Sequence, residues 1–287
     1  MNGTALVTGA ASGIGEATAI KLAASGWTVA AADVDPDGLA ALAQRISGVR
    51  TYVCDVSDER AVDSLRTPIG PVARLVHAAA IARLGRALEQ SREDFDRIWQ
   101  VNFVGTVNVV RAFLPAMVER GQGELVLYSS LDGWVPARKM SAYAASKAAV
   151  NAYAEVLAAE HKGSGVKIRC VCPGRVDTAQ YRGLAAEDPA AVAHHRSVMP
   201  VSVVVGAVER SLAGDGLFVF PGAVAKAGIR LRRHFPRLLG LLVDYDTSPA
   251  RSSPRPSPSR PARRRDVTQR PWAGRPRPGG RWQAPAR

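Results

Sequence analysis

The amino-acid sequence predicts an α/β fold, a doubly wound parallel sheet of seven strands with helices on both faces. Two observations carry this prediction. Short apolar runs typical of strands alternate with longer amphipathic patterns typical of helices, and a glycine-rich turn separates the first run from the first helix. Strands that alternate with helices are joined by right-handed crossovers, which make the sheet parallel and cover both of its faces.

Each element follows from its local pattern. Strands are expected where a short apolar run is bounded by polar or turn residues, at 5–8, 28–32, 50–54, 74–77, 124–129, 167–171 and 217–220. Helices are expected at 13–25, 37–46, 59–66, 92–119, 142–162 and 202–212. A last helical pattern, 223–243, carries several arginines and is broken at Pro236.

Composition divides the chain into three segments. The first, 1–222, has the strands and is expected to form the main domain, and 223–247 is a basic helical extension packed on it. The third, 248–287, holds 11 Arg and nine Pro against one acidic residue, Asp266, so most of the net charge of +13 belongs to it. Such a composition buries too little apolar surface to fold, so this tail is expected to be disordered. It could contact phosphates weakly, but a nucleic-acid-binding role is not expected.

The sequence also predicts where the protein resides. Strand-forming residues begin at Thr4, which leaves no signal peptide, and no run of about 20 apolar residues predicts a membrane span. The three cysteines, Cys54, Cys170 and Cys172, lie in or beside apolar runs, so we expect reduced, buried thiols, with the last two on opposite faces of one strand. No ligand spacing indicates a metal site. A soluble, cytoplasmic protein is expected.

A glycine-rich turn at residues 8–15, Thr-Gly-Ala-Ala-Ser-Gly-Ile-Gly, follows the first strand and opens the first helix. Glycines at such a turn let the backbone approach a pyrophosphate, whose charge is met by free N–H groups at the helix start. The turn therefore predicts a dinucleotide site. Its expected contacts are Gly9, Ser12, Gly13, Ile14 and Gly15.

Two carboxylates are expected near the adenosine half of that dinucleotide. Asp33 ends the second strand, where it can accept hydrogen bonds from a ribose diol and would repel a 2′-phosphate. No basic residue follows it, which favours NAD over NADP. Asp55, after the third strand, is placed to reach an adenine amino group. Alternatively it caps the next helix, although Ser57 and Asp58 are also available for that task.

Tyr143 and Lys147 lie four residues apart in the alanine-rich helical pattern, and Ser130 lies thirteen residues before the tyrosine. Positions i and i+4 share a helix face, so the lysine ammonium is expected to lower the tyrosine pKa from its usual value of about 10. A tyrosine tuned in this way can exchange protons. Taken alone, the Tyr/Lys spacing is common by chance and also fits two surface residues.

Together these features resemble the short-chain dehydrogenase/reductase family. The resemblance covers roughly residues 3–222, and its motifs are T-G-x-x-x-G-I-G at 8–15, D-V at 55–56, Asn102 in V-N-F-V-G-T, Ser130, Y-x-x-S-K at 143–147 and P-G-x-V-x-T at 173–178. It implies a Rossmann-type sheet and a catalytic tetrad of Asn102, Ser130, Tyr143 and Lys147. Further cofactor contacts are then expected from Val56, Ala79, Pro173, Gly174, Val176 and Thr178.

The resemblance also implies the chemistry. Tyr143 exchanges a proton with the substrate oxygen while hydride passes to or from a nicotinamide. Lys147 holds the nicotinamide ribose and tunes the tyrosine, Ser130 donates a hydrogen bond to the substrate oxygen, and Asn102 holds a water that links Lys147 to solvent.

Two departures from the family pattern stand out. The family's N-N-A-G after the fourth strand is replaced by His77-Ala78-Ala79-Ala80. Ala80 adds a methyl group near the cofactor and restricts φ, and Ala78 removes an amide that braces the central strands. The chain also continues past Pro221-Gly222 into a basic helix instead of ending at V-D-G-G, which argues against a role in fatty-acid synthesis.

The sequence therefore predicts an NAD(H)-dependent oxidoreductase that interconverts a secondary alcohol and a ketone on an apolar substrate. Residues 179–200 are expected to form a mobile lid over an apolar pocket, with Tyr181, Leu184, Val192 and Met199 as its apolar side chains. His194 and His195 lie in the same segment and are expected to be ordinary loop residues. Helices 92–119 and 142–162 are expected to pair between subunits in a homodimer or homotetramer. An NADPH-dependent carbonyl reductase and a non-catalytic cofactor-binding regulator are the alternatives.

Overall fold

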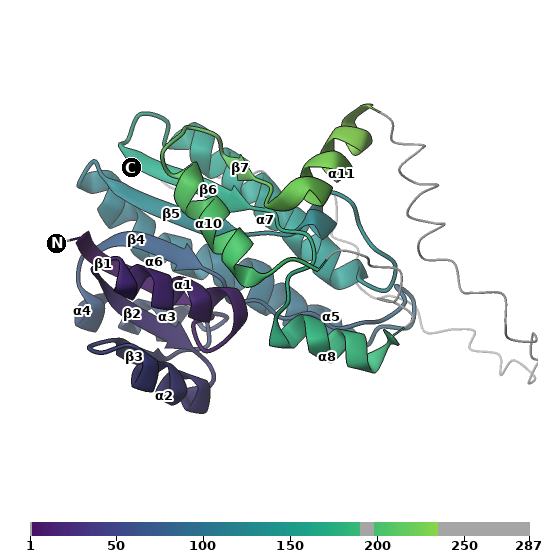
Figure 1. The fold of residues 1–287 in the computed structure, drawn as a ribbon, viewed down its shortest axis with the longest axis horizontal. Helices are drawn as coiled ribbons and strands as arrows, with labels where there is room; N and C mark the ends of the chain where they lie inside the picture. The colour runs from purple at the N-terminus through teal and green to yellow at the C-terminus, as the bar shows by residue number, and fades with distance from the viewer. Residues whose placement is uncertain (1, 190–197, 235–287) are drawn as a thin grey trace, which may run out of the picture. The chain divides into compact units, whose positions relative to one another are not determined.

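Seven parallel strands form one sheet in the computed structural model, which describes residues 2–189 and 198–234 (Figure 1). The strands are β1 (Asn2–Thr8), β2 (Trp27–Asp33), β3 (Arg50–Val53), β4 (Val72–His77), β5 (Gly123–Tyr128), β6 (Val166–Val171) and β7 (Phe218–Val219). Their order is β3-β2-β1-β4-β5-β6-β7, with every pairing parallel. The strand order reverses between β1 and β4, and ligands of such sheets bind at the carboxyl ends beside that point. The predicted seven-stranded, doubly wound α/β fold is confirmed.

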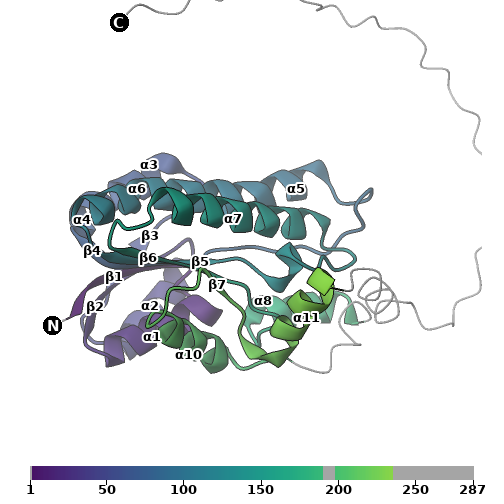
Figure 2. The same cartoon turned by 90° about the horizontal axis from the view of Figure 1, so that it is seen from above.

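Helices cover both faces of the sheet. They are α1 (Gly13–Ala24), α2 (Pro36–Arg45), α3 (Glu59–Ser64), α4 (Arg66–Ile69), α5 (Arg92–Trp99), α6 (Gly105–Glu119), α7 (Ser141–Glu160), α8 (Ala179–Glu187), α10 (Val201–Ser211) and α11 (Gly222–His234). Figure 2 shows α3, α4, α5, α6 and α7 on one side of the sheet and α1, α2 and α10 on the other. The sheet is thus the middle layer of three.

The core lies on the two faces of the sheet. Leu6, Leu75 and Leu125, from adjacent strands, are fully buried toward α3, α6 and α7, whereas Val7, Val76 and Val126 point toward α1, α2 and α10. Successive strand residues alternate between faces, and a parallel sheet buries both. This is why the central strands are apolar at nearly every position.

A π-helical turn, Gln100–Val104, joins α5 to α6 and was not expected from the sequence. The single helix predicted at 92–119 is therefore one helical segment with an extra residue in its middle. π-turns of this kind are frequent at functional sites. Here the turn carries Asn102, whose side chain is fully buried.

The apolar segment Arg92–Glu119 is long enough to span a membrane by length and composition, and most of its apolar window is buried inside the fold. Burial of this kind is typical of the core helix of a globular protein, and the pattern carries no further conclusion.

Two smaller expectations were wrong. The helix predicted at 59–66 is split into α3 and α4. Cys170 and Cys172 do not lie on opposite faces of their strand: both thiols contact Asn151 Oδ1, at 3.6 and 3.5 Å. Residues two apart in a strand share a face, so this outcome follows from the period of the strand. All three cysteines are free and buried.

Some predictions fall outside the described residues. These are the tail at 248–287, the end of the basic helix including Pro236, and the middle of the expected lid, with Val192, His194 and His195.

Candidate active site

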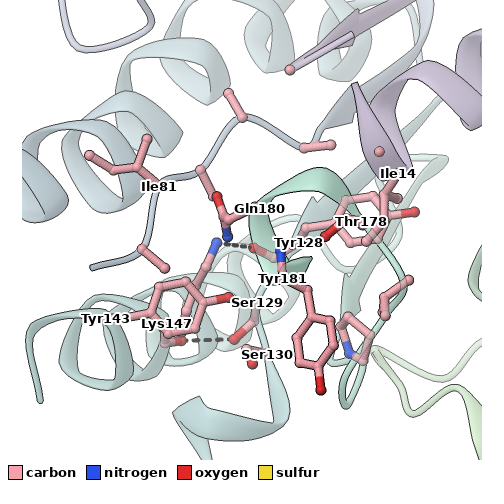
Figure 3. Close-up of a pocket in the computed structure, with 18 of the residues that line it drawn as sticks. Ile14, Ile81, Tyr128, Ser129, Ser130, Tyr143, Lys147, Thr178, Gln180 and Tyr181 are labelled. Atoms are coloured by element: carbon pink, nitrogen blue, oxygen red, sulfur yellow. Dashed lines mark hydrogen bonds between the residues drawn. The ribbon is translucent and has the colours of Figure 1, made fainter. Parts of the chain in front are cut away.

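A pocket of about 470 Å³ lies at the carboxyl ends of the strands. It is lined by the segments that follow β1 to β6 and by residues of α7 and α8 (Figure 3). Sixteen of the predicted site residues line it: Gly9, Ser12, Gly13, Ile14, Gly15, Asp33, Asp55, Val56, Ala79, Ser130, Tyr143, Lys147, Pro173, Gly174, Val176 and Thr178. Asn102 is the one predicted site residue that does not line the pocket; its side chain is buried beneath the pocket surface.

The glycine-rich turn is shaped for close backbone approach. Gly9 and Gly13 have positive φ values of 68° and 57°, which glycine adopts without strain. A Cβ on Gly15 would lie 1.9 Å from the carbonyl oxygen of Gly9. Ser12 precedes α1 in an extended conformation and makes no side-chain capping hydrogen bond, so its hydroxyl does not cover the helix start. These residues fit the pyrophosphate of a dinucleotide.

The two predicted carboxylates are both held in place. Asp33 accepts hydrogen bonds from the backbone N–H groups of Ala11 (2.9 Å) and Asp35 (3.1 Å). Asp55 accepts from Ser57 and from Arg97, the latter at 2.9 Å. Burial alone would raise the pKa of Asp55, but these hydrogen bonds hold it below its usual value.

Asp58 is the residue that caps α3, because its carboxylate accepts from the first N–H groups of that helix. The alternative role of Asp55 as the helix cap is therefore not used, which leaves Asp55 as part of the pocket wall.

The segment His77-Ala78-Ala79-Ala80, which departs from the family pattern after β4, is held by hydrogen bonds to β1 and has ordinary backbone geometry. A 2.7 Å hydrogen bond between Thr8 Oγ1 and His77 Nδ1 links the ends of β1 and β4, and Ala78 N donates to Thr8 O. Burial, and secondarily the charge of Lys147, lower the pKa of His77 to about 3, so the imidazole is neutral. Among the described non-glycine residues only Lys139 has a positive φ, so Ala80 adopts ordinary backbone geometry.

Tyr143 and Lys147 lie side by side on α7, as Figure 3 shows, with Lys147 Nζ 5.7 Å from the centre of the Tyr143 ring. Lys147 is 2% exposed, and its ammonium donates to Tyr128 O at 2.9 Å. Burial lowers the pKa of Lys147 to about 8. The Ser129 hydroxyl donates to Lys147 O at 2.9 Å, which fixes this turn of the helix to the end of β5.

The expectation that the Tyr143 pKa is lowered was wrong. Burial raises the pKa of the Tyr143 phenol, the negative charge of Asp132 raises it further, and a hydrogen bond with Ser130 only partly opposes them. Desolvation of the phenolate and the charge of Asp132 act in the same direction and together outweigh the hydrogen bond with Ser130. The tyrosine is therefore a protonated phenol at neutral pH.

Ser130 lies at the centre of this polar group. Its hydroxyl donates to Asp132 Oδ2 at 3.3 Å and accepts from Asp132 N at 3.1 Å. The same hydroxyl partly opposes the rise of the Tyr143 pKa, so Tyr143, Ser130 and Asp132 form one polar group in the pocket wall.

Asn102 joins two segments of the chain beneath the pocket surface. Its amide accepts from Ile81 N at 2.8 Å and donates to Ile81 O at 2.9 Å and Ser146 Oγ at 3.1 Å. It thereby fixes the loop after β4 against the helix that carries the Tyr/Lys pair. Its predicted role in holding a water stays a prediction.

The segment after β6 closes the pocket. Leu131 N donates to Pro173 O at 2.8 Å, and Val176 pairs with Met199 in an isolated bridge. Thr178 accepts from Tyr181 N and caps α8. Tyr181, Leu184 and Met199 line the pocket as the lid prediction requires, although whether this segment moves stays a prediction.

Several lining residues were not found by sequence reasoning, namely Asp132, Arg175, Arg97 and Gln180. Asp132 and Arg175 carried a readable signal, because each places a charge inside a motif, in Ser-Ser-Leu-Asp and Pro-Gly-Arg-Val. Arg97 and Gln180 lie on helices whose local sequence does not mark them.

Comparisons with known proteins agree with this geometry. The family model described as short chain dehydrogenase matches residues 3–188. The chain is 36% identical over 242 residues to 1-deoxy-11-beta-hydroxypentalenate dehydrogenase of Streptomyces exfoliatus, covering 80% of this chain and 86% of that one. It is 39% identical to a probable oxidoreductase, EphD, of Mycobacterium tuberculosis over 60% of this chain, but spans only 31% of that protein's length.

A D-threitol dehydrogenase of Mycolicibacterium smegmatis is 38% identical over 59% of this chain and 68% of its own. Among solved structures, a short-chain dehydrogenase from Burkholderia cenocepacia in complex with NADP superimposes with a TM-score of 0.74 at 25% identity, covering 84% of this chain and 97% of that one. With the motifs assembled in one pocket and the family match extending over most of the described residues, the chain belongs to the short-chain dehydrogenase family of oxidoreductases.

Proposed function

We propose that this protein is an NAD(H)-dependent oxidoreductase that interconverts a secondary alcohol and a ketone on a largely apolar substrate. The observation that carries the proposal is the presence of Tyr143 and Ser130 together in the pocket wall, with the buried ammonium of Lys147 beside the tyrosine ring. Two relatives, named for the dehydrogenation of a hydroxypentalenate and of D-threitol, support a reaction of this type.

The pocket residues fit a dinucleotide, which when bound supplies the hydride donor or acceptor. The turn from Gly9 to Gly15 would hold the pyrophosphate, Asp33 the adenosine ribose, and Lys147 the nicotinamide ribose. The segment from Pro173 to Thr178 would hold the carboxamide side.

Tyr143 then provides the proton. In the reducing direction its phenol donates to the oxygen of the ketone as that oxygen gains negative charge, and Ser130 holds the same oxygen in position. The raised pKa of Tyr143 suits this direction, because the phenol keeps its proton through neutral pH. Lys147, charged below a pH of about 8, stabilises negative charge on the tyrosine once the proton has left.

Use of NADPH is the second candidate, since a structural neighbour binds NADP. We favour NAD because the carboxylate of Asp33 lines the pocket and is fixed there by two backbone N–H groups. A carboxylate so held would repel a 2′-phosphate.

The test replaces Tyr143 by Phe in the full chain and measures NADH-dependent reduction of a panel of aliphatic and aromatic ketones. The variant keeps the ring and loses only the hydroxyl, so kcat/KM is expected to fall about 10³-fold while NADH binding is retained. Tyr153→Phe is the matched control, because Tyr153 lies on the same helix and packs on Phe103 away from the pocket. If Tyr143→Phe matched the rate of the control variant, the proposal would be wrong.

A further inference from the structure

Asp132 and Arg175 place two opposite charges in the wall of the pocket. Asp132 lies in the short helical turn Leu131–Gly133 after β5, and Arg175 follows Gly174 after β6. The two segments are joined by the hydrogen bond from Leu131 N to Pro173 O. Both side chains are half-buried; burial raises the pKa of the Asp132 carboxyl, and the positive charge of Arg175 partly opposes this rise.

The carboxylate lies one hydrogen bond away from the reacting centre. Ser130 Oγ, which holds the substrate oxygen in the proposed reaction, is 3.3 Å from Asp132 Oδ2. Ser130 has one hydroxyl proton, which it donates to Asp132 in this structure. When Ser130 turns that proton to a substrate oxygen, the carboxylate is left one hydrogen bond short, beside the group on the neighbouring carbon. This position distinguishes Asp132 from a charge at the outer rim of the pocket.

The hydrogen bonds that order the loop use only part of the capacity of the Asp132 carboxylate to accept hydrogen bonds. Besides Ser130, its carboxylate accepts from the backbone N–H of Ala137, which folds the loop before α7. Two carboxylate oxygens accept about four hydrogen bonds. An uncharged Asn or Ser would order the loop without the free-energy cost of placing a charge in a partly desolvated pocket.

Two opposite charges in one pocket wall favour a neutral polar group on the substrate. A carboxylate on the substrate is attracted by Arg175 but repelled by Asp132, and an ammonium meets the reverse situation. A hydroxyl avoids both conflicts, because it donates to the carboxylate and accepts from the guanidinium. The remaining wall near these residues, with Leu131, Val135 and Met140, is apolar and suits a carbon skeleton.

We propose that Asp132 and Arg175 form a polar subsite that selects substrates with a hydroxyl on the carbon next to the reacting one, that is, α-hydroxy ketones and the corresponding vicinal diols. The inference rests on the proposed function and narrows its substrate class. Both residues determine specificity in this reaction, which leaves proton transfer to Tyr143.

The experiment compares matched ketones that differ only in that hydroxyl, 3-hydroxy-2-butanone with 2-butanone and 2-hydroxyacetophenone with acetophenone. The full chain is assayed with NADH and with NADPH, and the readout is the ratio of kcat/KM values within each pair. Effects that change both rates equally cancel in this ratio. The wild-type protein is expected to prefer the hydroxy ketone about 100-fold or more, since a site built to bind a hydroxyl rejects the analogue that lacks it.

Asp132→Ala and Arg175→Met are each expected to reduce this preference at least 10-fold, and Asp132→Asn, which keeps an acceptor and the loop contacts, to give an intermediate value. Asp177→Asn is the matched control, because Asp177 lies in the same segment as Arg175, pairs with Arg182 and does not line the pocket. Its ratio is expected to equal that of the wild type. Thermal unfolding and NADH binding confirm that each variant is folded.

A wild-type ratio near one, or a high ratio that survives in Asp132→Ala, would overturn the subsite while leaving the oxidoreductase proposal intact. Failure of the proposed function has a different signature, in which no ketone of either kind is reduced or Tyr143→Phe reduces them as well as the wild type, and that result removes the subsite too.

Discussion

Lys147→Met tests the energetics of the site through the pH dependence of stability. Burial lowers the pKa of Lys147 from 10.5 to about 8, which corresponds to about 3 kcal/mol of unfavourable free energy for the charged form in the folded protein. Between these two pH values the unfolded chain binds more protons than the folded one. The lysine therefore contributes stability that is complete above pH 10.5 and is lost as the pH falls through about 8.

The magnitude follows from the two pKa values. From pH 7 to pH 10 the free energy of unfolding of the wild type should rise by about 2.5 kcal/mol relative to the Lys147→Met variant. At pH 7 the two proteins should be nearly equal in stability. The variant escapes the cost of the buried charge but leaves Tyr128 O without its 2.9 Å donor, a loss of about 1–3 kcal/mol.

The assay is urea unfolding of both proteins at pH 7, 8, 9 and 10, followed by circular dichroism. Titrating groups that do not interact with Lys147 cancel in the difference between wild type and variant. Lys167→Met is the matched control, because Lys167 is exposed and its ammonium also donates to a backbone carbonyl, Leu212 O, at 2.8 Å. The difference for this control should stay flat. A flat or falling difference for Lys147→Met would refute the reasoning, since it would mean that the ammonium is solvated in the folded protein.

Two further predictions concern the cofactor. In Gly15→Ala the new methyl group would lie 1.9 Å from the carbonyl oxygen of Gly9, so the turn must shift. The affinity for NADH, measured by fluorescence titration, should therefore fall about 100-fold, or about 2.7 kcal/mol. Gly216→Ala, with no atom within 4 Å, is the control, and binding by Gly15→Ala within threefold of it would contradict the argument. For cofactor choice, kcat/KM with NADH should exceed that with NADPH about 100-fold, and Asp33→Ser should narrow the gap to tenfold or less. A wild-type preference for NADPH would show that Asp33 does not exclude the 2′-phosphate.

The fold was largely predictable because its signals are local. Apolar runs between turn residues mark strands, and their alternation with helical patterns determines a parallel sheet with little ambiguity. The π-turn at Gln100–Val104 was not predictable in this way, because one extra residue in a turn leaves the apolar pattern of a long helix almost unchanged. The last strand is shorter than expected, with only Phe218 and Val219 paired, because an edge strand is limited by its one neighbour and not by its own sequence.

The candidate site was predictable wherever a motif residue follows a strand, since the carboxyl ends of parallel strands meet at one edge. The pKa of Tyr143 was not, because the sequence shows the nearby lysine but not the burial, which has the larger effect. Asp132 and Arg175 were missed for a related reason. Their charges are visible in the sequence, but only the folded chain shows that the segments after β5 and β6 adjoin.

The hydrogen bond between Leu131 N and Pro173 O uses backbone atoms only. Whatever side chains stand at neighbouring positions 132 and 175, this link between the two loops can form unchanged. The alignment of the two loops is therefore set by backbone atoms, whereas the charges that face the pocket are set by side chains. Single substitutions at these positions can change the charge of the pocket wall while the two loops stay joined.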